Sequence, residues 1–237
     1  MKQHSGQNLY LRRIIGTVHE QNAFLVADLW SRMAVVIDPG PGTFDRIHAL
    51  IQDMSLELNY ILLTHEHYDH MGDVEPTRKF YPSCKVVAST ATSECLQDPK
   101  RNLSAFHSGS NFSTGPADIQ FDEDEMSLPW SGHVIRLNRT QGHSPGSICI
   151  AIAGVLFTGD TMINGTRTVI KLPGGSRNEL IASLDWLFGN HPPATQIQPG
   201  HGAPFFLRET SKEIHCSLKT CASQEILRES ALNKSQI

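Results

Sequence analysis

The chain contains, at residues 64–70, the stretch Thr64-His65-Glu66-His67-Tyr68-Asp69-His70. It directly follows the apolar run Tyr60-Ile61-Leu62-Leu63, which is typical of a buried strand. Three histidines and one aspartate within six positions can close on a metal ion with little loop entropy left to lose. Imidazole nitrogen and carboxylate oxygen suit zinc or iron, and a cluster without cysteine is unlike a purely structural zinc knuckle. The stretch therefore predicts a metal site, against the alternative of a polar turn rich in histidine.

Three more candidate ligands lie in turns that contain glycine or proline, each after an apolar stretch. They are His143 between Gly142 and Ser144-Pro145-Gly146, Asp160 after Gly159, and His201 between Gly200 and Gly202. Glycine at such positions lets the backbone approach a crowded cluster. Taken alone, each residue is better explained by a structural role. Together with residues 64–70, they indicate one site assembled from distant segments.

These motifs resemble, in residue type and order, those of the metallo-β-lactamase superfamily. They are residues 64–70, Thr140-Gln-Gly-His143-Ser-Pro-Gly-Ser, Leu156-Phe-Thr-Gly-Asp160-Thr and Pro199-Gly-His201-Gly. The resemblance implies an α/β fold, a four-layer αβ/βα sandwich of two mixed sheets face to face with helices outside. Within the superfamily, Asp98-Pro-Lys-Arg-Asn102-Leu-Ser and Leu172-Pro-Gly-Gly175 most resemble the small glyoxalase II-like (hydroxyacylglutathione hydrolase-like) hydrolases.

The resemblance also implies two metal sites built from the motif residues. His65, His67 and His143 would bind the first ion, Asp69, His70 and His201 would bind the second, and Asp160 would bridge them. We expect two divalent ions, zinc with iron or manganese as alternatives, and we expect Asp69 and His70 to be catalytic. Asp38, in the turn Asp38-Pro-Gly-Pro-Gly42, is implied to support the metals, with a turn-capping role as the alternative.

Three ligands and one shared carboxylate per ion leave a coordination position for water, which marks a catalytic centre. Two divalent ions can lower the pKa of a bound water from 15.7 to about 7, so a metal-bound hydroxide can attack a carbonyl without a serine or cysteine nucleophile. A thiolate, with a parent pKa of about 8.5, departs without a proton, whereas an amine needs one. Tyr68 and His107 are the candidate donors.

This chemistry favours hydrolysis of a thioester, either a small thiol conjugate or a carrier-bound acyl group. Lactone or β-lactam hydrolysis at the same centre is the first alternative. An iron-dependent persulfide dioxygenase is less favoured, because Asp69, His70 and His201 would then be redundant. The remaining alternative is a non-catalytic relative that only binds a ligand.

The candidate substrate residues lie in two segments. Residues 98–118 form a long polar stretch that we expect to lie over the site as a substrate rim containing His107, unless it is a plain surface loop. Small relatives usually show Arg-x-Asp before Leu/Phe-Pro-Gly-Gly, and here that acidic residue is lost, which leaves a basic rim with Arg167 and Lys171. They can receive an anionic acyl or carrier group, or they are simply solvated. Only 36 residues follow His201, so part of the glutathione-binding surface of full-length glyoxalase II enzymes must be missing.

Length and composition favour one hydrolase domain over residues 1–237, with a helical tail at 208–237. The polar start, the lack of any apolar run near ~18 residues and five cysteines without C-x-x-C spacing predict a cytoplasmic protein without a membrane partner. The net charge of −4 offers no footprint for nucleic acid. The sequence leaves the oligomeric state open.

Hydrophobic periodicity predicts a layered alternation of strands and helices. Strands are expected at residues 11–18, 22–28, 33–37, 60–63, 85–88, 133–137, 147–153 and 155–157, and a short apolar stretch at 195–198 leads into Pro199. Helices are expected at 43–54 with Thr43 as N-cap, after Gly72, from Ser89-Thr90 onward, and at 178–188. The acidic run 122–125 is predicted to be a solvated hairpin.

Overall fold

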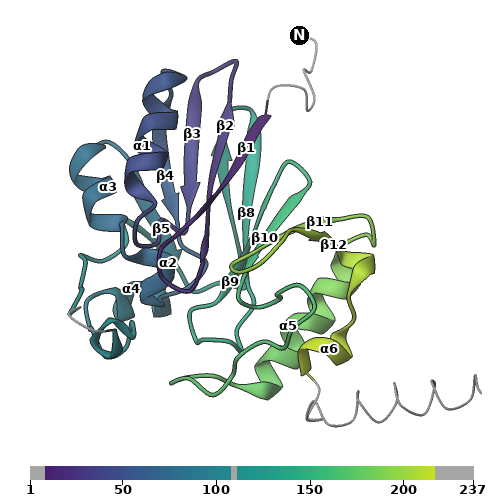
Figure 1. Ribbon diagram of the computed structural model, residues 1–237. Coiled ribbons are helices and arrows are strands. Elements are labelled where there is room, and N and C mark those ends of the chain that lie inside the picture. The colour runs from purple at the N-terminus through teal and green to yellow at the C-terminus, as the bar shows by residue number, and fades with distance from the viewer. Residues whose placement is uncertain (1–8, 108–110, 217–237) are drawn as a thin grey trace, which may run out of the picture.

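The computed structural model of the protein describes residues 9–107 and 111–216. Two six-stranded mixed sheets face each other, with strand orders β1-β2-β3-β4-β5-β6 and β12-β11-β10-β9-β8-β7. Helices cover the outer face of each sheet, α1 and α3 on one side and α5 and α6 on the other (Figure 1). This arrangement confirms the four-layer αβ/βα sandwich.

The first sheet begins as an antiparallel meander and continues with parallel strands. Its strands are β1 (Leu9–Ile15), β2 (Asn22–Asp28), β3 (Met33–Ile37), β4 (Glu57–Leu62), β5 (Lys85–Ser89) and β6 (Ile119–Phe121). Parallel neighbours need crossover connections, and here these contain α1 (Phe44–Asp53), α2 (Tyr68–Met71), α3 (Val74–Phe80), α4 (Thr90–Leu96) and the 3-10 turn η1 (Ser104–Phe106). The parallel strands therefore end at one edge of the sheet.

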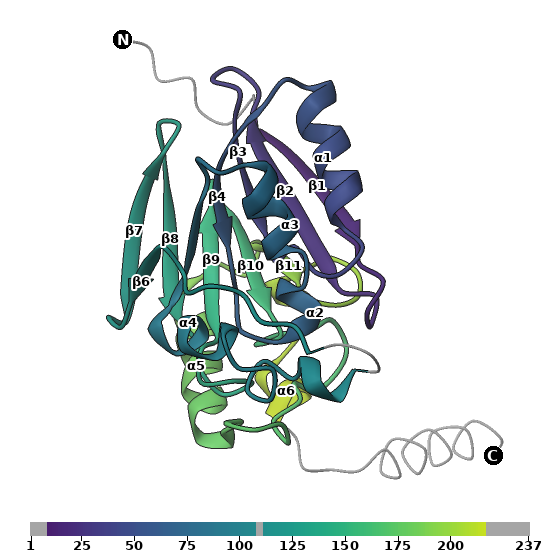
Figure 2. The same ribbon diagram turned by 90° about the vertical axis from the view of Figure 1, so that its left-hand side faces the viewer.

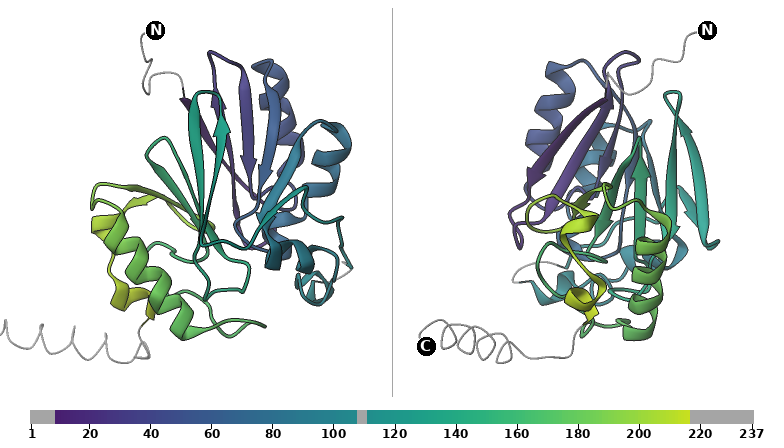
Figure 3. Two further views of the ribbon diagram at one scale, coloured as in Figure 1. Left: turned by 180° about the vertical axis from the view of Figure 1, so that it is seen from behind. Right: turned by 90° about the vertical axis from the view of Figure 1, so that its right-hand side faces the viewer.

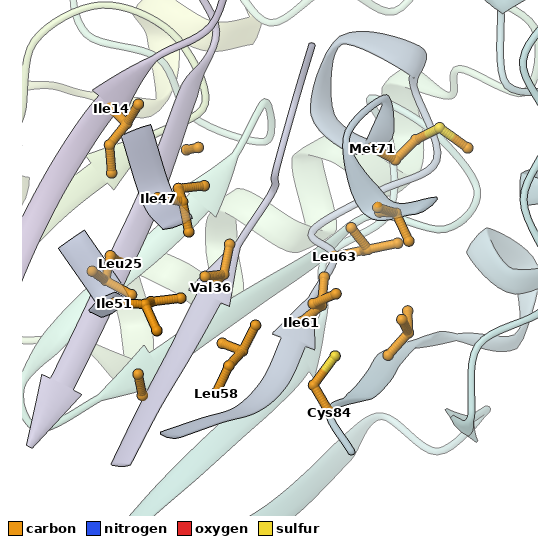
Figure 4. Packing of buried hydrophobic residues seen from close by; sticks show 14 of the residues in the cluster. Ile14, Leu25, Val36, Ile47, Ile51, Leu58, Ile61, Leu63, Met71 and Cys84 are labelled. Atoms are coloured by element: carbon orange, nitrogen blue, oxygen red, sulfur yellow. The ribbon is translucent and has the colours of Figure 1, made fainter. Parts of the chain in front are cut away.

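Apolar residues on the outer face of this sheet hold its helices. Ile47 and Ile51 of α1 pack over Leu25, Val36 and Ile61, and all five are buried (Figure 4). Burying a side chain of this size contributes about 1.5–3 kcal/mol, so α1 is anchored by packing rather than by propensity alone.

The second sheet and its helices form the other half. Its elements are β7 (Glu125–Trp130), β8 (His133–Arg139), β9 (Ile148–Ile152), β10 (Val155–Gly159), α5 (Arg177–Asn190), β11 (Gln196–Pro199), β12 (Phe205–Phe206), η2 (Leu207–Glu209) and α6 (Lys212–Cys216). Phe24 of β2 packs against Phe157 of β10 between the sheets, with ring centroids 5.1 Å apart. Helix α5 covers the outer face of the second sheet (Figure 3). Its Leu180 and Leu184 belong to one buried cluster with Leu156 of β10 and Ile197 of β11.

Most predicted elements are confirmed, with shifted ends, but some were missed. Strands β6, β7 and β12 and helix α2 were not predicted, because they are short or, in β7, interrupted by polar residues and Pro129. The acidic run 122–125 is exposed, as predicted, but it does not form a hairpin, because it connects β6 of the first sheet to β7 of the second. Of the helical tail, η2 and α6 lie within the described residues, and 217–237 lie outside them.

The predicted cap of α1 needs a correction. Thr43 occupies the N-cap position, but its side chain makes no capping bond. Instead, Asp73 Oδ2 accepts hydrogen bonds from the backbone N–H groups of Thr43 and Phe44, each at 2.8 Å. The Thr43 hydroxyl donates to the Gly40 carbonyl at 2.7 Å, so a distant carboxylate satisfies the helix start.

Loops at one end of both sheets lie close together around α2 and α4 (Figure 2). The backbone N–H of Ile148 donates to the Thr64 carbonyl at 2.8 Å, and that of Asn22 donates to the Gly200 carbonyl at 2.7 Å. These bonds tie the candidate ligand loops of the two sheets together. Within the described residues, no helix is long and apolar enough to cross a membrane.

Candidate metal centre

The stretch 64–70 leaves β4 in an extended conformation and turns into α2 at Tyr68. His67 has φ −66° and ψ 142°, so neighbouring side chains in this segment point to opposite sides. His65 and His67 face one way, and the turn of α2 then brings Asp69 and His70 beside them. The backbone N–H of His70 donates to the His67 carbonyl at 2.9 Å, which closes the turn.

The first predicted ligand set converges on one point. His65 Nε2 lies 3.1 Å from His67 Nδ1, and His143 Nε2 lies 3.0 Å from the same His67 nitrogen. All three side chains are buried. Three ring nitrogens that face one another at this range are arranged as one face of a metal site.

The second set lies beside the first, and Asp160 lies between them. His201 Nε2 is 3.3 Å from Asp69 Oδ2 and 3.3 Å from His70 Nε2. Asp160 Oδ2 is 3.7 Å from His143 Nε2 and 3.5 Å from His201 Nε2. The carboxylate of Asp160 thus reaches one nitrogen of each set, which is the position that a bridging ligand requires.

Hydrogen bonds on the far side of the rings decide which nitrogens face the centre as acceptors. His143 Nδ1 donates to the Val169 carbonyl at 2.7 Å, and His201 Nδ1 donates to the His19 carbonyl at 3.0 Å. A carbonyl can only accept, so each Nδ1 carries the proton and each Nε2 keeps its lone pair. The same logic applies to His70, whose Nδ1 lies 2.9 Å from Asp38 Oδ2.

Asp38 supports both sides of the centre. Its carboxylate accepts hydrogen bonds from Thr64 N at 2.7 Å and from Thr64 Oγ1 at 2.6 Å, besides the His70 ring. Since the Thr64 hydroxyl donates to Asp38, it can only accept from His65 Nδ1, 3.0 Å away, which leaves His65 Nε2 free for a metal. The side chain of Asp38 therefore contacts both the His70 ring and Thr64, the residue before His65.

The pKa values of the ligand residues show that the protein atoms at the centre favour a positive charge. Burial and neighbouring imidazoles lower the pKa of His65 well below its usual range and that of His67 to about 3, so both rings are neutral at pH 7. Burial opposes charge on His70 as well, but Asp69, Asp160 and Asp38 outweigh it and raise the pKa of His70 to about 9. Burial would raise the pKa of Asp69, yet His70 and His201 outweigh it and lower that pKa.

The residues present fit divalent cations. Asp160 Oδ1 is buried without a hydrogen-bond partner among the described residues, and a buried carboxylate oxygen needs a donor or a cation. Neutral imidazole lone pairs and carboxylate oxygens are the donor types that suit zinc, iron and manganese. Asp69, Asp160 and Asp38 raise the pKa of His70 and so favour positive charge at this position, which a bound cation would also supply.

A cavity of about 750 Å³ opens onto the centre. Polar ligand residues form its floor, and its wall is mostly apolar, with Leu103, Phe106, Ile163, Val169, Leu172 and Pro173. Of the predicted substrate residues, His107 and Arg167 line this cavity. Lys171 lines a separate cavity of about 250 Å³ together with Arg167 and Arg177. Tyr68 contacts His107, with ring centroids 5.3 Å apart.

The long segment 98–118 contributes to the cavity as expected, through Leu103, Phe106 and His107. Buried Asn102 holds this segment in place. Its side-chain amide donates a hydrogen bond to the Phe112 carbonyl at 2.9 Å, and its backbone carbonyl accepts one from the Tyr68 N–H at 2.8 Å. The segment is therefore tied directly to the ligand loop. Residues 108–110 lie outside the described residues.

Sequence reasoning missed several supporting groups. The backbone carbonyls of His19 and Val169 orient two ligands, and the side chain of His19 also lines the cavity. His19 and Glu20 have φ of 53° and 52°, a left-handed turn that residues other than glycine rarely adopt. A backbone carbonyl has no sequence motif, so the roles of His19 and Val169 could be recognised only from the positions of the ligand side chains in the structure.

Comparison with known proteins agrees with this geometry. A model of the metallo-β-lactamase superfamily matches residues 16–201. The probable polyketide biosynthesis zinc-dependent hydrolase BaeB of Bacillus velezensis is 30% identical over 178 residues, which cover 75% of this chain and 71% of the relative. The B3 metallo-β-lactamase BLEG-1 has a similar structure, with a TM-score of 0.78 at 29% identity, covering 88% of this chain and 98% of that one.

The similarity to glyoxalase II covers a shorter segment. The hydroxyacylglutathione hydrolase of Klebsiella pneumoniae is 30% identical over 131 residues, which are 55% of this chain and 43% of the relative. The superfamily resemblance is thus confirmed, while the similarity to the polyketide hydrolase extends over more of the chain.

Proposed function

Because the chain belongs to the metallo-β-lactamase superfamily, we propose that it is a metal-dependent hydrolase with two divalent ions, which cleaves a thioester. The substrate class is a small thiol conjugate or a carrier-bound acyl group. The observation that carries this proposal is the pair of three-residue ligand sets with the Asp160 carboxylate between them.

The residues divide the work of holding the centre. His65, His67 and His143 would hold one ion, Asp69, His70 and His201 would hold the other, and Asp160 would contact both. When bound, the ions supply an activated water and polarise the carbonyl of the substrate. Asp38 and the carbonyls of His19 and Val169 keep the imidazole rings in the binding tautomer.

The cavity supports an acyl substrate. An apolar wall that contains Phe106, Ile163 and Leu172 can contact an acyl chain and exclude water around the reacting carbonyl. A thiolate can leave without a proton, so His107 is not required as a donor in this reaction. This argument favours a thioester over a lactam.

The leaving thiol, in this proposal, carries an anionic group. Arg167 lines the main cavity and also the smaller one, where Lys171 and Arg177 add two further cations. A carboxylate or phosphate on the thiol could therefore reach up to three cations beside the metal cavity. We also place the enzyme in the cytoplasm, since five cysteines without C-x-x-C spacing fit a reducing compartment.

A β-lactam is the second candidate substrate, because the similar structure of BLEG-1 is that of a B3 metallo-β-lactamase. A panel separates the candidates: lactoylglutathione, acyl-CoA, an acyl-carrier protein, a homoserine lactone and a chromogenic β-lactam, assayed with metal-loaded enzyme. We expect kcat/KM for at least one thioester to exceed that for the lactone and the lactam. Faster lactam or lactone turnover would contradict the proposal.

A further inference from the structure

Glu66 lies between two ligand histidines but faces away from them. It occupies the extended segment with His65 and His67, where successive side chains point to opposite sides. Its side chain is buried, with 2% of the residue exposed. A carboxylate buried directly behind the first ligand set needs hydrogen-bond or ionic partners to offset the free-energy cost of its burial.

The partners of Glu66 come from two other segments of the chain. Its Oε2 atom accepts a hydrogen bond from Ser144 Oγ at 3.0 Å and another from Thr92 Oγ1 at 3.2 Å. Ser144 directly follows the ligand His143, and Thr92 lies in the first turn of α4. The carboxylate thus joins the loop that carries His65 and His67 to the loop that carries His143.

Gly146 shows how closely the two loops fit. A Cβ atom at this position would lie 2.4 Å from Glu66 Oε2 and 2.1 Å from Thr92 Oγ1. The Gly146 carbonyl also accepts a hydrogen bond from Ser89 Oγ at 2.8 Å and lies 3.1 Å from Thr92 Oγ1, whose single proton is shared between this carbonyl and Glu66. The His143 loop is therefore held against Glu66 and the start of α4 with no space for a side chain.

Within residues 9–107 and 111–216, no cationic side chain forms an ion pair with the Glu66 carboxylate. Among the described residues, none of the ion pairs within 4.0 Å includes it. Its contacts are instead hydroxyl groups that fix the spacing of the two ligand loops. Asp38 holds the His70 side of the centre in a comparable way, and the His143 side has Glu66.

We infer that Glu66 is a positioning residue for the first metal site, which sets His143 Nε2 against the nitrogens of His65 and His67 through Ser144. This inference rests on the metal centre proposed above. It is tested by the affinity of the full-length protein for zinc in competition with a chelator, and by the visible absorption spectrum of the cobalt-substituted protein.

Glu66→Ala is expected to weaken the first-site affinity about 10–100-fold, the range typical of lost hydrogen bonds behind metal ligands. Glu66→Gln keeps an acceptor oxygen for Ser144 and Thr92, so it is expected to fall between the wild type and Glu66→Ala. The cobalt spectrum of Glu66→Ala should change in band position or intensity, which a general loss of stability would not cause.

Asp28→Asn is the matched control. Asp28 is also buried and accepts hydrogen bonds from Ser131 Oγ at 2.6 Å and Trp30 N at 2.9 Å, but it lies at the end of β2 away from α2 (Figure 1). This variant should lose stability while keeping zinc affinity within about twofold and the cobalt spectrum of the wild type.

Several outcomes would overturn the inference. The positioning role would be rejected if Glu66→Ala had the zinc affinity and cobalt spectrum of the wild type. It would also be rejected if Glu66→Gln lowered the zinc affinity as much as Glu66→Ala. If Glu66→Ala does not fold, Ser144→Ala takes its place, because it removes only the direct link to the His143 loop; unchanged affinity there would also reject the role. A wild-type protein that binds no metal would instead refute the proposed function.

Discussion

Asp38 Oδ2 lies 2.9 Å from His70 Nδ1, on the side of the imidazole ring that faces away from the metal ligands. This contact fixes the proton on Nδ1 and directs the lone pair of Nε2 toward His201 and Asp160. Asp38 follows β3 and has φ 50°, so a left-handed residue at a strand end delivers the carboxylate. The orientation of a ligand from the second set thus depends on a residue 32 positions earlier in the chain.

Asp38→Ala should therefore weaken binding of the second metal ion about 10–100-fold, because His70 loses its orienting partner and Thr64 loses its acceptor. Chelator competition measures the loss, and exposed Asp45→Ala serves as the control. Equal second-site affinity in Asp38→Ala and the wild type would show that Asp38 does not orient a ligand.

Protein expressed with sufficient metal should contain close to two ions per chain. The expectation follows from two ligand sets that share Asp160 and from the unpartnered Asp160 Oδ1 atom. Elemental analysis against protein concentration measures the ratio, before and after dialysis with a chelator. One ion or none after metal-replete expression would contradict the dinuclear centre.

Asp69→Ala and His201→Ala should each remove the second ion and most hydrolysis while leaving the fold intact. Asp69 lies in the short helix α2 and His201 lies in the turn after β11, and both are outside the three apolar clusters that form the core. Metal content, circular dichroism and thioester turnover are measured on the same samples. Wild-type rates in either variant would reject their assignment as ligands.

Metal-free protein should lose stability as the pH rises from 6.5 to 8.5. The pKa of His70 is about 9 in the folded protein, above the ordinary histidine value of 6.5, so its contribution to the free energy of unfolding is complete below pH 6.5 and declines as the pH approaches 9. The loss over this window is about 2 kcal/mol for a shift of this size. His65 and His67 have lowered pKa values, so their contributions are already complete above pH 6.5.

Urea unfolding of chelator-treated protein at both pH values measures this change in the free energy of unfolding. His70→Asn should show a smaller loss, because the main titrating group is absent. A wild-type protein that is equally stable at pH 6.5 and 8.5 would show that the acidic residues around His70 do not hold a proton there.

Removal of charge at Arg167 and Lys171 tests substrate binding. The double variant Arg167→Gln/Lys171→Gln should raise KM for a thioester with an anionic thiol by about tenfold, with a smaller effect on kcat, as expected for lost uniform binding. A neutral N-acetylcysteamine thioester should be affected much less. An unchanged KM for the anionic substrate would leave these residues without a role in binding.

Arg177→Gln extends the same test to the smaller cavity, which Arg177 lines together with Arg167 and Lys171. It should raise KM only for anionic thiols. Arg136→Gln, which removes an exposed cation from β8, is the control and should leave KM unchanged for every thioester.

The sequence by itself determined the features that depend on residues close together in the chain. His65, His67, Asp69 and His70 are neighbours in the chain, so their spacing alone predicted a metal site, and glycine-rich turns indicated His143, Asp160 and His201. Apolar periodicity predicted the layers, because burial on the two faces of a strand or one face of a helix leaves a regular pattern. The exact ends of the elements and the short strands β6 and β12 could not be predicted, since they contain too few residues for a pattern.

Only the tertiary structure decided how these ligands are held. Glu66 contacts Ser144, 78 residues away, and His201 donates to the His19 carbonyl across 182 positions. Lys171 was paired with Arg167 by proximity in sequence, yet it lines only the smaller of the two cavities that Arg167 lines. Contacts between distant segments arise from the packing of the two sheets. No sequence pattern predicts which residue a backbone carbonyl or a buried carboxylate will contact. The sequence thus determined which atoms can bind metal, and the fold decided the tautomer and direction of each.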